Sequence, residues 1–140
     1  MRTLIACLLL SACVTSAPAS PPERVAGCWI NRDVGAVTMR WLLERARPGV
    51  LAGVRTVYGQ AGVTSSMRYA LEPSGQGWSL CELDAEAAAA TRCWQVAEGE
   101  GGSLDGGRAF IDTHGDSLRI SVLGLGAEQV IFQGRRDGCD

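Results

Sequence analysis

The sequence predicts an all-β domain, an antiparallel up-and-down β-barrel of about eight or nine short strands. Two observations support this fold class. Hydrophobic and polar residues alternate with a period of two from Val25 onward, which is typical of strands with one buried face. The 18 glycines are spread between the alternating segments, as tight turns require. Because no helix longer than about two turns is evident, the strands must cover their own edges, which a barrel or a sandwich achieves.

The alternation is clearest in residues 37–44, where Met39 and Trp41 share one face and Thr38 and Arg40 the other. Turns that contain glycine or proline separate the segments that follow. Residues 85–90 are good helix formers but too few to hold a helix alone. In chain order, the expected strands are one opened by Gly27-Cys28-Trp29, then residues 37–44, 51–58, 63–71, 78–84, 91–97, 108–113, 117–123 and 129–133.

The hydrophobic residues that point inward form either a packed core or the wall of a ligand cavity. An eight-stranded barrel is just wide enough for either. Small residues such as Gly53, Ser65 and Ala70 fall among the large ones, which favours a cavity for an apolar or amphipathic molecule. The expected interior residues are Met39, Trp41, Leu51, Met67, Tyr69, Trp78, Leu80, Phe110 and Ile120. Of these, we expect a ligand to contact Met39, Trp41, Met67, Tyr69 and Trp78.

The N-terminus has the pattern of an export signal. Arg2 precedes the apolar run Leu4 to Leu10, which is too short to span a bilayer, since that takes about 20 residues. Leu10-Ser11-Ala12-Cys13 resembles the bacterial lipobox. The resemblance implies cleavage before Cys13 and attachment of lipid to its sulfur. The alternative is ordinary secretion with cleavage near Ala17 or Ala19.

The chain therefore divides into a lipoprotein signal peptide (1–12), a lipidated cysteine with a flexible tether (13–24), and a barrel domain (25–140). Residues 14–24 are small, polar and proline-rich, as in a disordered tether. The membrane is then a partner through the lipid anchor, because two or more acyl chains anchor stably. Val14 in place of Asp implies, by the same resemblance, an outer-membrane lipoprotein that faces the periplasm or the cell surface.

Export also decides how the six cysteines are interpreted. Cys7 leaves with the signal and Cys13 takes lipid, so four remain in an oxidising compartment and predict two disulfides. Cys81 and Cys93 lie at the ends of an expected hairpin, and Cys28 and Cys139 lie at the ends of the domain. We therefore prefer the pairing 81–93 with 28–139. A zinc site is disfavoured, because the chain has one histidine and no Cys-x-x-Cys pair. No metal or other cofactor is expected.

The motif Gly27-Cys28-Trp29 resembles the start of lipocalin and calycin barrels. In those barrels the tryptophan plugs one end and an arginine after the last strand covers its ring, which implies that role for Trp29 with Arg135 or Arg136. Trp41 and the run Pro48 to Arg55 add a resemblance to a lipocalin-like bacterial domain family of unknown function, DUF6265. It covers about the first third of the domain. A late segment of that family containing His-Asp is missing here, so the resemblance implies a fold and no activity.

Few residues suggest catalysis. His114 with Asp112 and Asp116 is better explained as a solvated turn, and Glu82, Asp84 and Glu86 as a solvated rim on one strand face. We expect no catalytic residue. A formal net charge of −2 without a basic stripe argues against nucleic-acid binding.

The expected function is a binding module, with a small apolar or amphipathic ligand in the barrel. The alternative is a non-enzymatic interaction or inhibitor protein with a side-chain-filled barrel. Such a protein would present loops such as 85–90 or 99–107 to a partner in the cell envelope. An enzyme is the least favoured of the three.

Overall fold

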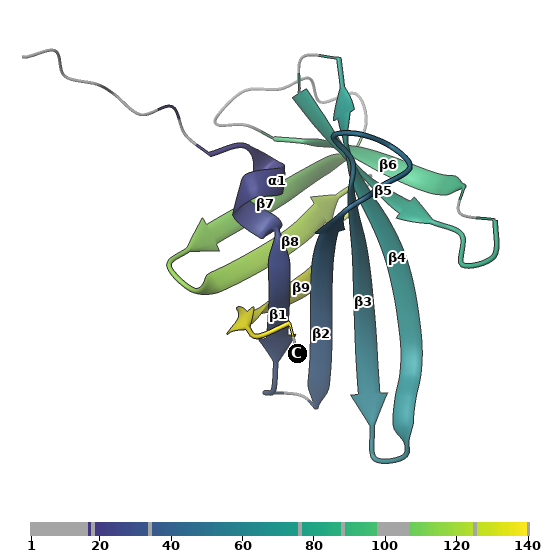
Figure 1. Ribbon diagram of the computed structural model, residues 1–140, viewed down its shortest axis with the longest axis vertical. Helices are drawn as coiled ribbons and strands as arrows, with labels where there is room; N and C mark the ends of the chain where they lie inside the picture. Colours follow the sequence, from purple (N-terminus) through teal and green to yellow (C-terminus); the bar gives the residue numbers. More distant parts are fainter. Residues whose placement is uncertain are drawn as a thin grey trace, which may run out of the picture.

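In the computed structural model, residues 17, 19–33, 35–75, 77–87, 89–97, 107–124 and 126–139 are described. Nine strands within them form one closed barrel, in which β9 returns to pair with β1 (Figure 1). The predicted all-β barrel is confirmed. The strands are β1 (Gly27–Asn31), β2 (Ala36–Leu43), β3 (Leu51–Gly59), β4 (Gly62–Ser74), β5 (Gly77–Leu83), β6 (Ala90–Val96), β7 (Arg108–His114), β8 (Ser117–Leu123) and β9 (Glu128–Asp137).

One pair of neighbours departs from the predicted antiparallel order. β6 and β7 run parallel, through the pairs Gln95–Arg108 and Val96–Ala109, whereas every other neighbouring pair is antiparallel. A closed barrel in which every neighbouring pair is antiparallel needs an even number of strands. With nine strands, at least one neighbouring pair must be parallel. Residues 97–107 separate the two strands, close to the dozen or so residues that a parallel connection needs.

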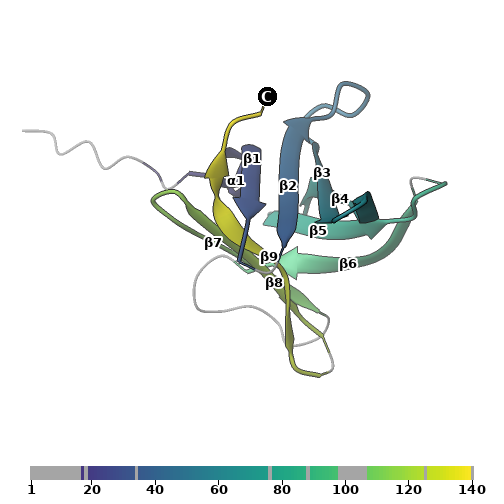
Figure 2. The same cartoon turned by 90° about the horizontal axis from the view of Figure 1, so that it is seen from below.

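The inward faces of the strands pack into a hydrophobic core. Trp29, Met39 and Trp41 are its largest side chains with less than 2% exposure. Strands β7 to β9 face β2 to β5 across this interior (Figure 2). Gly53 makes room for Trp41, because a Cβ added at Gly53 would lie 2.5 Å from the indole ring. The expected interior residues Leu51, Leu80 and Ile120 are also fully buried.

The prediction that Phe110 points inward is wrong. Ala109 pairs with Val122 and Ile111 with Ile120, and these four side chains are buried. Phe110 lies between them in sequence, so the alternation of the strand turns its side chain to the outer face. Residue size was a misleading guide here, because the smaller alanine and isoleucine carry the inner face.

Part of the segment predicted as a flexible tether, residues 14–24, is helical. A short helix, α1 (Pro21–Val25), lies beside the barrel, and Val25 is completely buried (Figure 1). Both the amide and the hydroxyl of Ser20 donate hydrogen bonds to the Glu23 carboxylate, at 2.7 and 2.9 Å. Ser-x-x-Glu with proline at the first helical position is a helix-start pattern that composition alone obscures. Cys13 and the preceding residues lie outside the described part of the chain.

Two disulfides close the domain. Cys28 is bonded to Cys139, with Cα atoms 5.4 Å apart, and Cys81 to Cys93, with Cα atoms 4.0 Å apart. This is the pairing that the sequence favours. Two disulfides indicate an extracytoplasmic protein, because reducing compartments do not sustain such bonds. Among the described residues, no helix has the length and apolar character needed to cross a membrane.

Candidate functional site

A hollow of about 220 Å³ opens among inward-facing side chains of β3 to β6 and the facing strands β8 and β9. Trp94, Val122 and Ile131 give it a buried apolar wall, and Met67 and Val130 are partly exposed at its rim. We call it the Arg55 hollow. Its lining residues are Arg55, Met67, Tyr69, Glu82, Arg92, Trp94, Val122, Gln129, Val130 and Ile131.

One acidic side chain of the Arg55 hollow is already neutralised. Glu82, with 17% of its side chain exposed, accepts a hydrogen bond from Arg92 at 3.1 Å. The Arg92 guanidinium also lies 4.9 Å from the centre of the Trp94 ring, which fixes its position. Burial raises the pKa of Tyr69, and the negative charge of Glu82 adds to this effect, so Tyr69 keeps its proton at neutral pH.

Arg55 has no such partner. Within the described residues its side chain makes no hydrogen bond or ion pair, and its Nε is buried without an acceptor. Two arginines and one glutamate leave the lining with a net charge of +1. An adjoining hollow of about 260 Å³ shares Arg55, Val130 and Ile131 and extends toward Asn31. Arg55 therefore presents a positive charge, without a partner among the described residues, between two adjoining hollows.

The predicted ligand residues divide between this hollow and the core. Met67 and Tyr69 line the Arg55 hollow. Met39 and Trp41 are fully buried in the core, and Trp78 is partly buried against it. The five are therefore not gathered around one space, because core packing occupies three of them. Ligand contact stays a prediction for each.

Of the two arginines predicted to cover Trp29, Arg136 lies over its ring and Arg135 does not. The Arg136 guanidinium lies 4.2 Å from the centre of the Trp29 ring and also donates to the Ala26 carbonyl at 3.3 Å. The Trp29 indole N–H donates to the Val25 carbonyl at 2.8 Å, which ties α1 to the barrel. Arg135 pairs with Ile30 and points away from this ring into an outer depression. Both arginines lie within β9, which is longer than the predicted 129–133.

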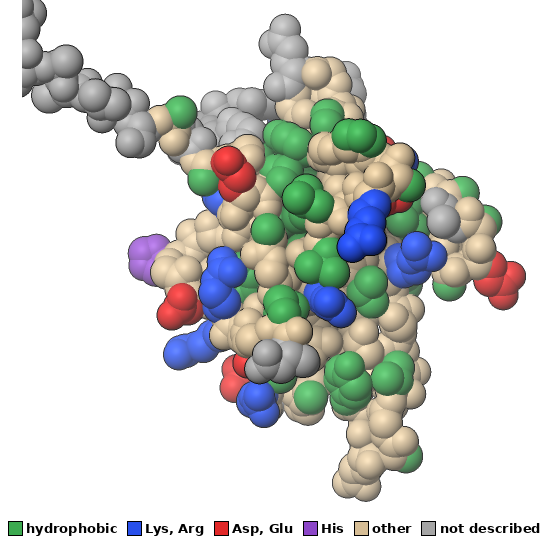
Figure 3. Space-filling model, in the orientation of Figure 1, with side chains coloured by type: hydrophobic (Ala, Val, Ile, Leu, Met, Phe, Trp, Pro, Cys, Tyr) green, Lys and Arg blue, Asp and Glu red, His purple; other side chains and the backbone are tan. Residues whose placement is uncertain are grey.

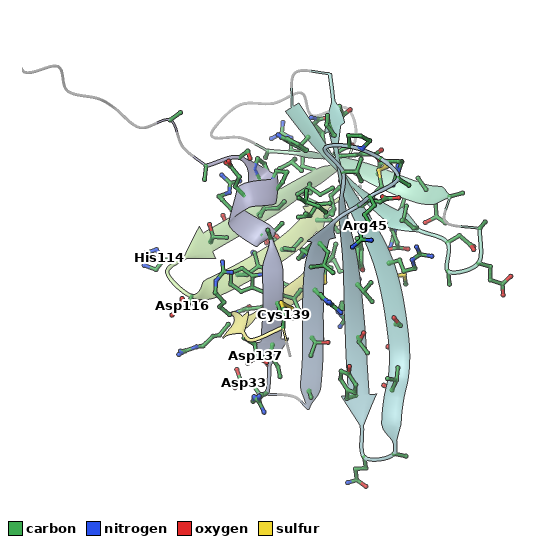
Figure 4. The ribbon with its side chains drawn as sticks, viewed as in Figure 1. Asp33, Arg45, His114, Asp116, Asp137 and Cys139 are labelled. Carbon is green, nitrogen blue, oxygen red and sulfur yellow. A yellow bond between two sulfur atoms is a disulfide. The ribbon has the colours of Figure 1, made fainter. Side chains whose placement is uncertain are left out.

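The two acidic clusters are mostly exposed to solvent. Asp112, His114 and Asp116 are exposed around the turn between β7 and β8, and the labelled side chains of the last two point outward (Figure 4). The prediction that Glu82 shares a solvated rim with Asp84 is wrong, because β5 ends at Leu83 and Glu82 faces the hollow. In the part of the chain that is described, no group of three histidine, cysteine or acidic residues could hold a metal ion.

A small polar cluster fastens the bulge between β8 and β9. The completely buried Ser121 donates to the Glu128 carboxylate at 2.6 Å, and Arg119 donates to it at 2.8 Å. These two hydrogen bonds, that of Ser121 above all, hold the pKa of Glu128 below its ordinary value of 4.5. With its hydroxyl committed to a carboxylate and shielded from solvent, Ser121 is a structural residue.

This cluster predicts a stability loss in acid. A carboxyl whose pKa is lowered by folding stabilises the protein above its unfolded pKa, and the contribution disappears as the pH falls through the folded pKa. We expect Glu128→Gln to flatten the decline of the urea unfolding midpoint between about pH 6 and pH 3. Glu86→Gln, in an exposed turn, is the control. A decline in the Glu128 variant as steep as that of the unmodified protein would contradict the assignment.

Two larger depressions lie on the outer surface. One, of about 410 Å³, is bordered by Arg47, but this residue pairs with Glu44 and Glu72, each at 3.0 Å. The other, of about 370 Å³, is lined largely by exposed polar residues around Asp33 and Arg135. Figure 3 shows arginine side chains dispersed among hydrophobic ones on the face drawn. The first depression also contains Arg68, which is exposed on the outer face of β4, and no lining residue of the second is buried.

Sequence reasoning missed Arg55 and Arg92. The signal was present, because Arg55 follows Leu51 and Gly53 at spacings of two, and Arg92 precedes Trp94 and Val96 in the same way. Only hydrophobic residues were assigned to the interior. Charged residues on an inward face mark the place where the barrel is not filled.

No protein-family model matches the chain, and neither a curated protein nor a solved structure matches it at a significant level.

Proposed function

We propose that this protein is a membrane-anchored binding module that holds a small amphipathic molecule in the Arg55 hollow. The observation that carries the proposal is the Arg55 side chain, uncompensated by any described residue and set beside a buried apolar wall. The Nε atom of Arg55 is buried although the residue as a whole is partly exposed, and a buried polar atom without a partner costs about 1–3 kcal/mol. A ligand that supplies the partner recovers this free energy.

The proposal includes the location of the protein in the cell envelope. Lipid on Cys13 would hold the domain near a bilayer, and Val14 after it favours the outer membrane. The two disulfides support an extracytoplasmic location, and the stacking of Arg136 on Trp29 is in keeping with a lipocalin-like barrel.

A second candidate function is an interaction protein with a filled barrel. The observation that favours it is the dense core, with Trp29, Met39 and Trp41 all but inaccessible. The Arg55 hollow is also smaller than the roughly 300–1,000 Å³ typical of pockets for drug-sized ligands. Loop 85–90 is exposed at its described positions, whereas residues 99–106 of the other predicted contact loop lie outside the described residues.

Native mass spectrometry of the protein extracted from its own membrane tests the proposal. We expect a population carrying a small molecule that dissociates on collisional activation. In the same spectra, the mature chain should begin at Cys13 and carry the mass of a diacylglyceryl group. A clean apo mass in every growth condition would favour the interaction protein, and an unmodified cysteine would contradict the anchor.

A further inference from the structure

We infer that the ligand of the Arg55 hollow is a small monocarboxylate with an apolar tail, whose carboxylate is held by the Arg55 guanidinium. This inference rests on the proposed function and specifies the class of ligand. It follows from three features of the site: the charge of its lining, the geometry of the guanidinium, and the arrangement of apolar residues around it.

Charge selects a monoanion. Arg92 is paired with Glu82 and stacked on Trp94, so its positive charge is neutralised by a residue of the protein. Arg55 is left with one positive charge and no counterion among the described residues. A carboxylate supplies one negative charge, whereas a phosphate monoester supplies about 1.5 to 2 at neutral pH and would leave the site negative.

Geometry selects a planar head. The guanidinium presents its N–H groups as a flat fork that matches both oxygens of a carboxylate. The ring hydroxyl of Tyr69, another lining residue, keeps its proton because burial raises its pKa, so it can serve as a neutral donor. Among the described residues that line the hollow, the one acidic side chain, Glu82, is bound to Arg92 and does not compete for Arg55.

The surroundings select an apolar tail of limited size. Ile131 and Trp94 are buried beside the charged groups, and the adjoining hollow begins at Ile131 and Val130. At about 220 Å³ the Arg55 hollow holds a head and the first part of a tail. The rest of the tail would run past Val130 or Met67, which are 45% and 38% exposed, toward solvent.

Binding of decanoate, decanol and acetate to the delipidated full domain, followed by isothermal titration calorimetry, tests this inference. We expect decanoate to bind at least about tenfold more tightly than either decanol or acetate, because each of these lacks one of the two recognised parts. Arg55→Gln should weaken decanoate binding by about 10- to 100-fold and leave decanol binding unchanged. Arg55→Lys keeps the positive charge but not the planar fork of N–H groups. Its affinity for decanoate should therefore lie between that of the unmodified protein and that of Arg55→Gln.

Arg68→Gln is the matched control, because Arg68 lies on the exposed outer face of β4, directly after Met67. This variant should bind decanoate as tightly as the unmodified protein does. Equal affinity for decanoate and decanol, or full affinity in Arg55→Gln, would overturn the inference while the binding function stands. If none of the three probes binds the unmodified protein, the proposed function itself fails. The comparison of probes on the unmodified protein needs no variant to fold.

Discussion

Replacing Trp41 by alanine should lower the free energy of unfolding by roughly 3–5 kcal/mol, the range for removing a large aromatic side chain from a packed core. Trp41 is 1% exposed and lies across Gly53 on the neighbouring strand. Its indole N–H finds no acceptor among the described residues, so Trp41→Phe removes an unpaired polar group along with part of the ring. The phenylalanine variant should therefore lose much less stability. Chemical denaturation followed by circular dichroism measures both.

The contact with Gly53 makes this prediction specific. Gly53→Ala should cost about 1–3 kcal/mol by itself, because the added methyl group would overlap the Trp41 ring. In the Trp41→Ala background the same substitution should cost nothing or restore stability, since alanine suits a strand better than glycine. The double-mutant cycle should give a coupling of about 0.5–3 kcal/mol. Additive effects would show that the two residues do not meet as described.

Removing the Cys28–Cys139 disulfide should cost about 4–5 kcal/mol in the chain-entropy model, because the bridge closes a very long loop. The two cysteines are 111 residues apart, whereas Cys81 and Cys93 are 12 apart, and the shorter bridge should contribute about 3 kcal/mol. The measurement is the unfolding free energy of the Cys28→Ala/Cys139→Ala and Cys81→Ala/Cys93→Ala variants under non-reducing conditions. An equal or larger loss from the hairpin pair would contradict this order.

The reduced form of the unmodified protein is the control for that pair of variants. It lacks both bridges and should be the least stable of the four samples. Non-reducing peptide mapping checks the pairing independently. A peptide that links Cys28 to Cys81 or Cys93 would contradict the closure of the barrel ends.

Local pattern predicted most of the strands correctly. A run such as residues 117–123 carries its own alternation, and the connections on either side of it are short, so its antiparallel neighbours follow from order along the chain. The prediction for Phe110 is wrong, because the alternation of the strand places Ala109 and Ile111 on the inner face and not the larger Phe110 between them. Prediction from local pattern also failed at the start of the domain, where a four-residue capping motif decided the structure of α1 within a segment whose composition suggested disorder.

The candidate site was much harder to predict. Alternation places Arg55 on an inner face, but only the closed barrel shows that Arg92 is claimed by Glu82 while Arg55 is left without a partner. These groups come from three different strands and meet through register and curvature. Neither is encoded at any single position.

The sequence by itself predicted the fold class and favoured the disulfide pairing that the structure contains, because each depends on residues close in sequence or on a simple order along the chain. The export signal stays a prediction. The tertiary structure decided the number and direction of the strands at closure, the filling of the interior by Met39 and Trp41, and the place where space remains. The physical reason is that closing a sheet fixes which distant strands face one another. The packed core around Met39 and Trp41 and the unpaired charge of Arg55 both lie between strands that are distant in sequence.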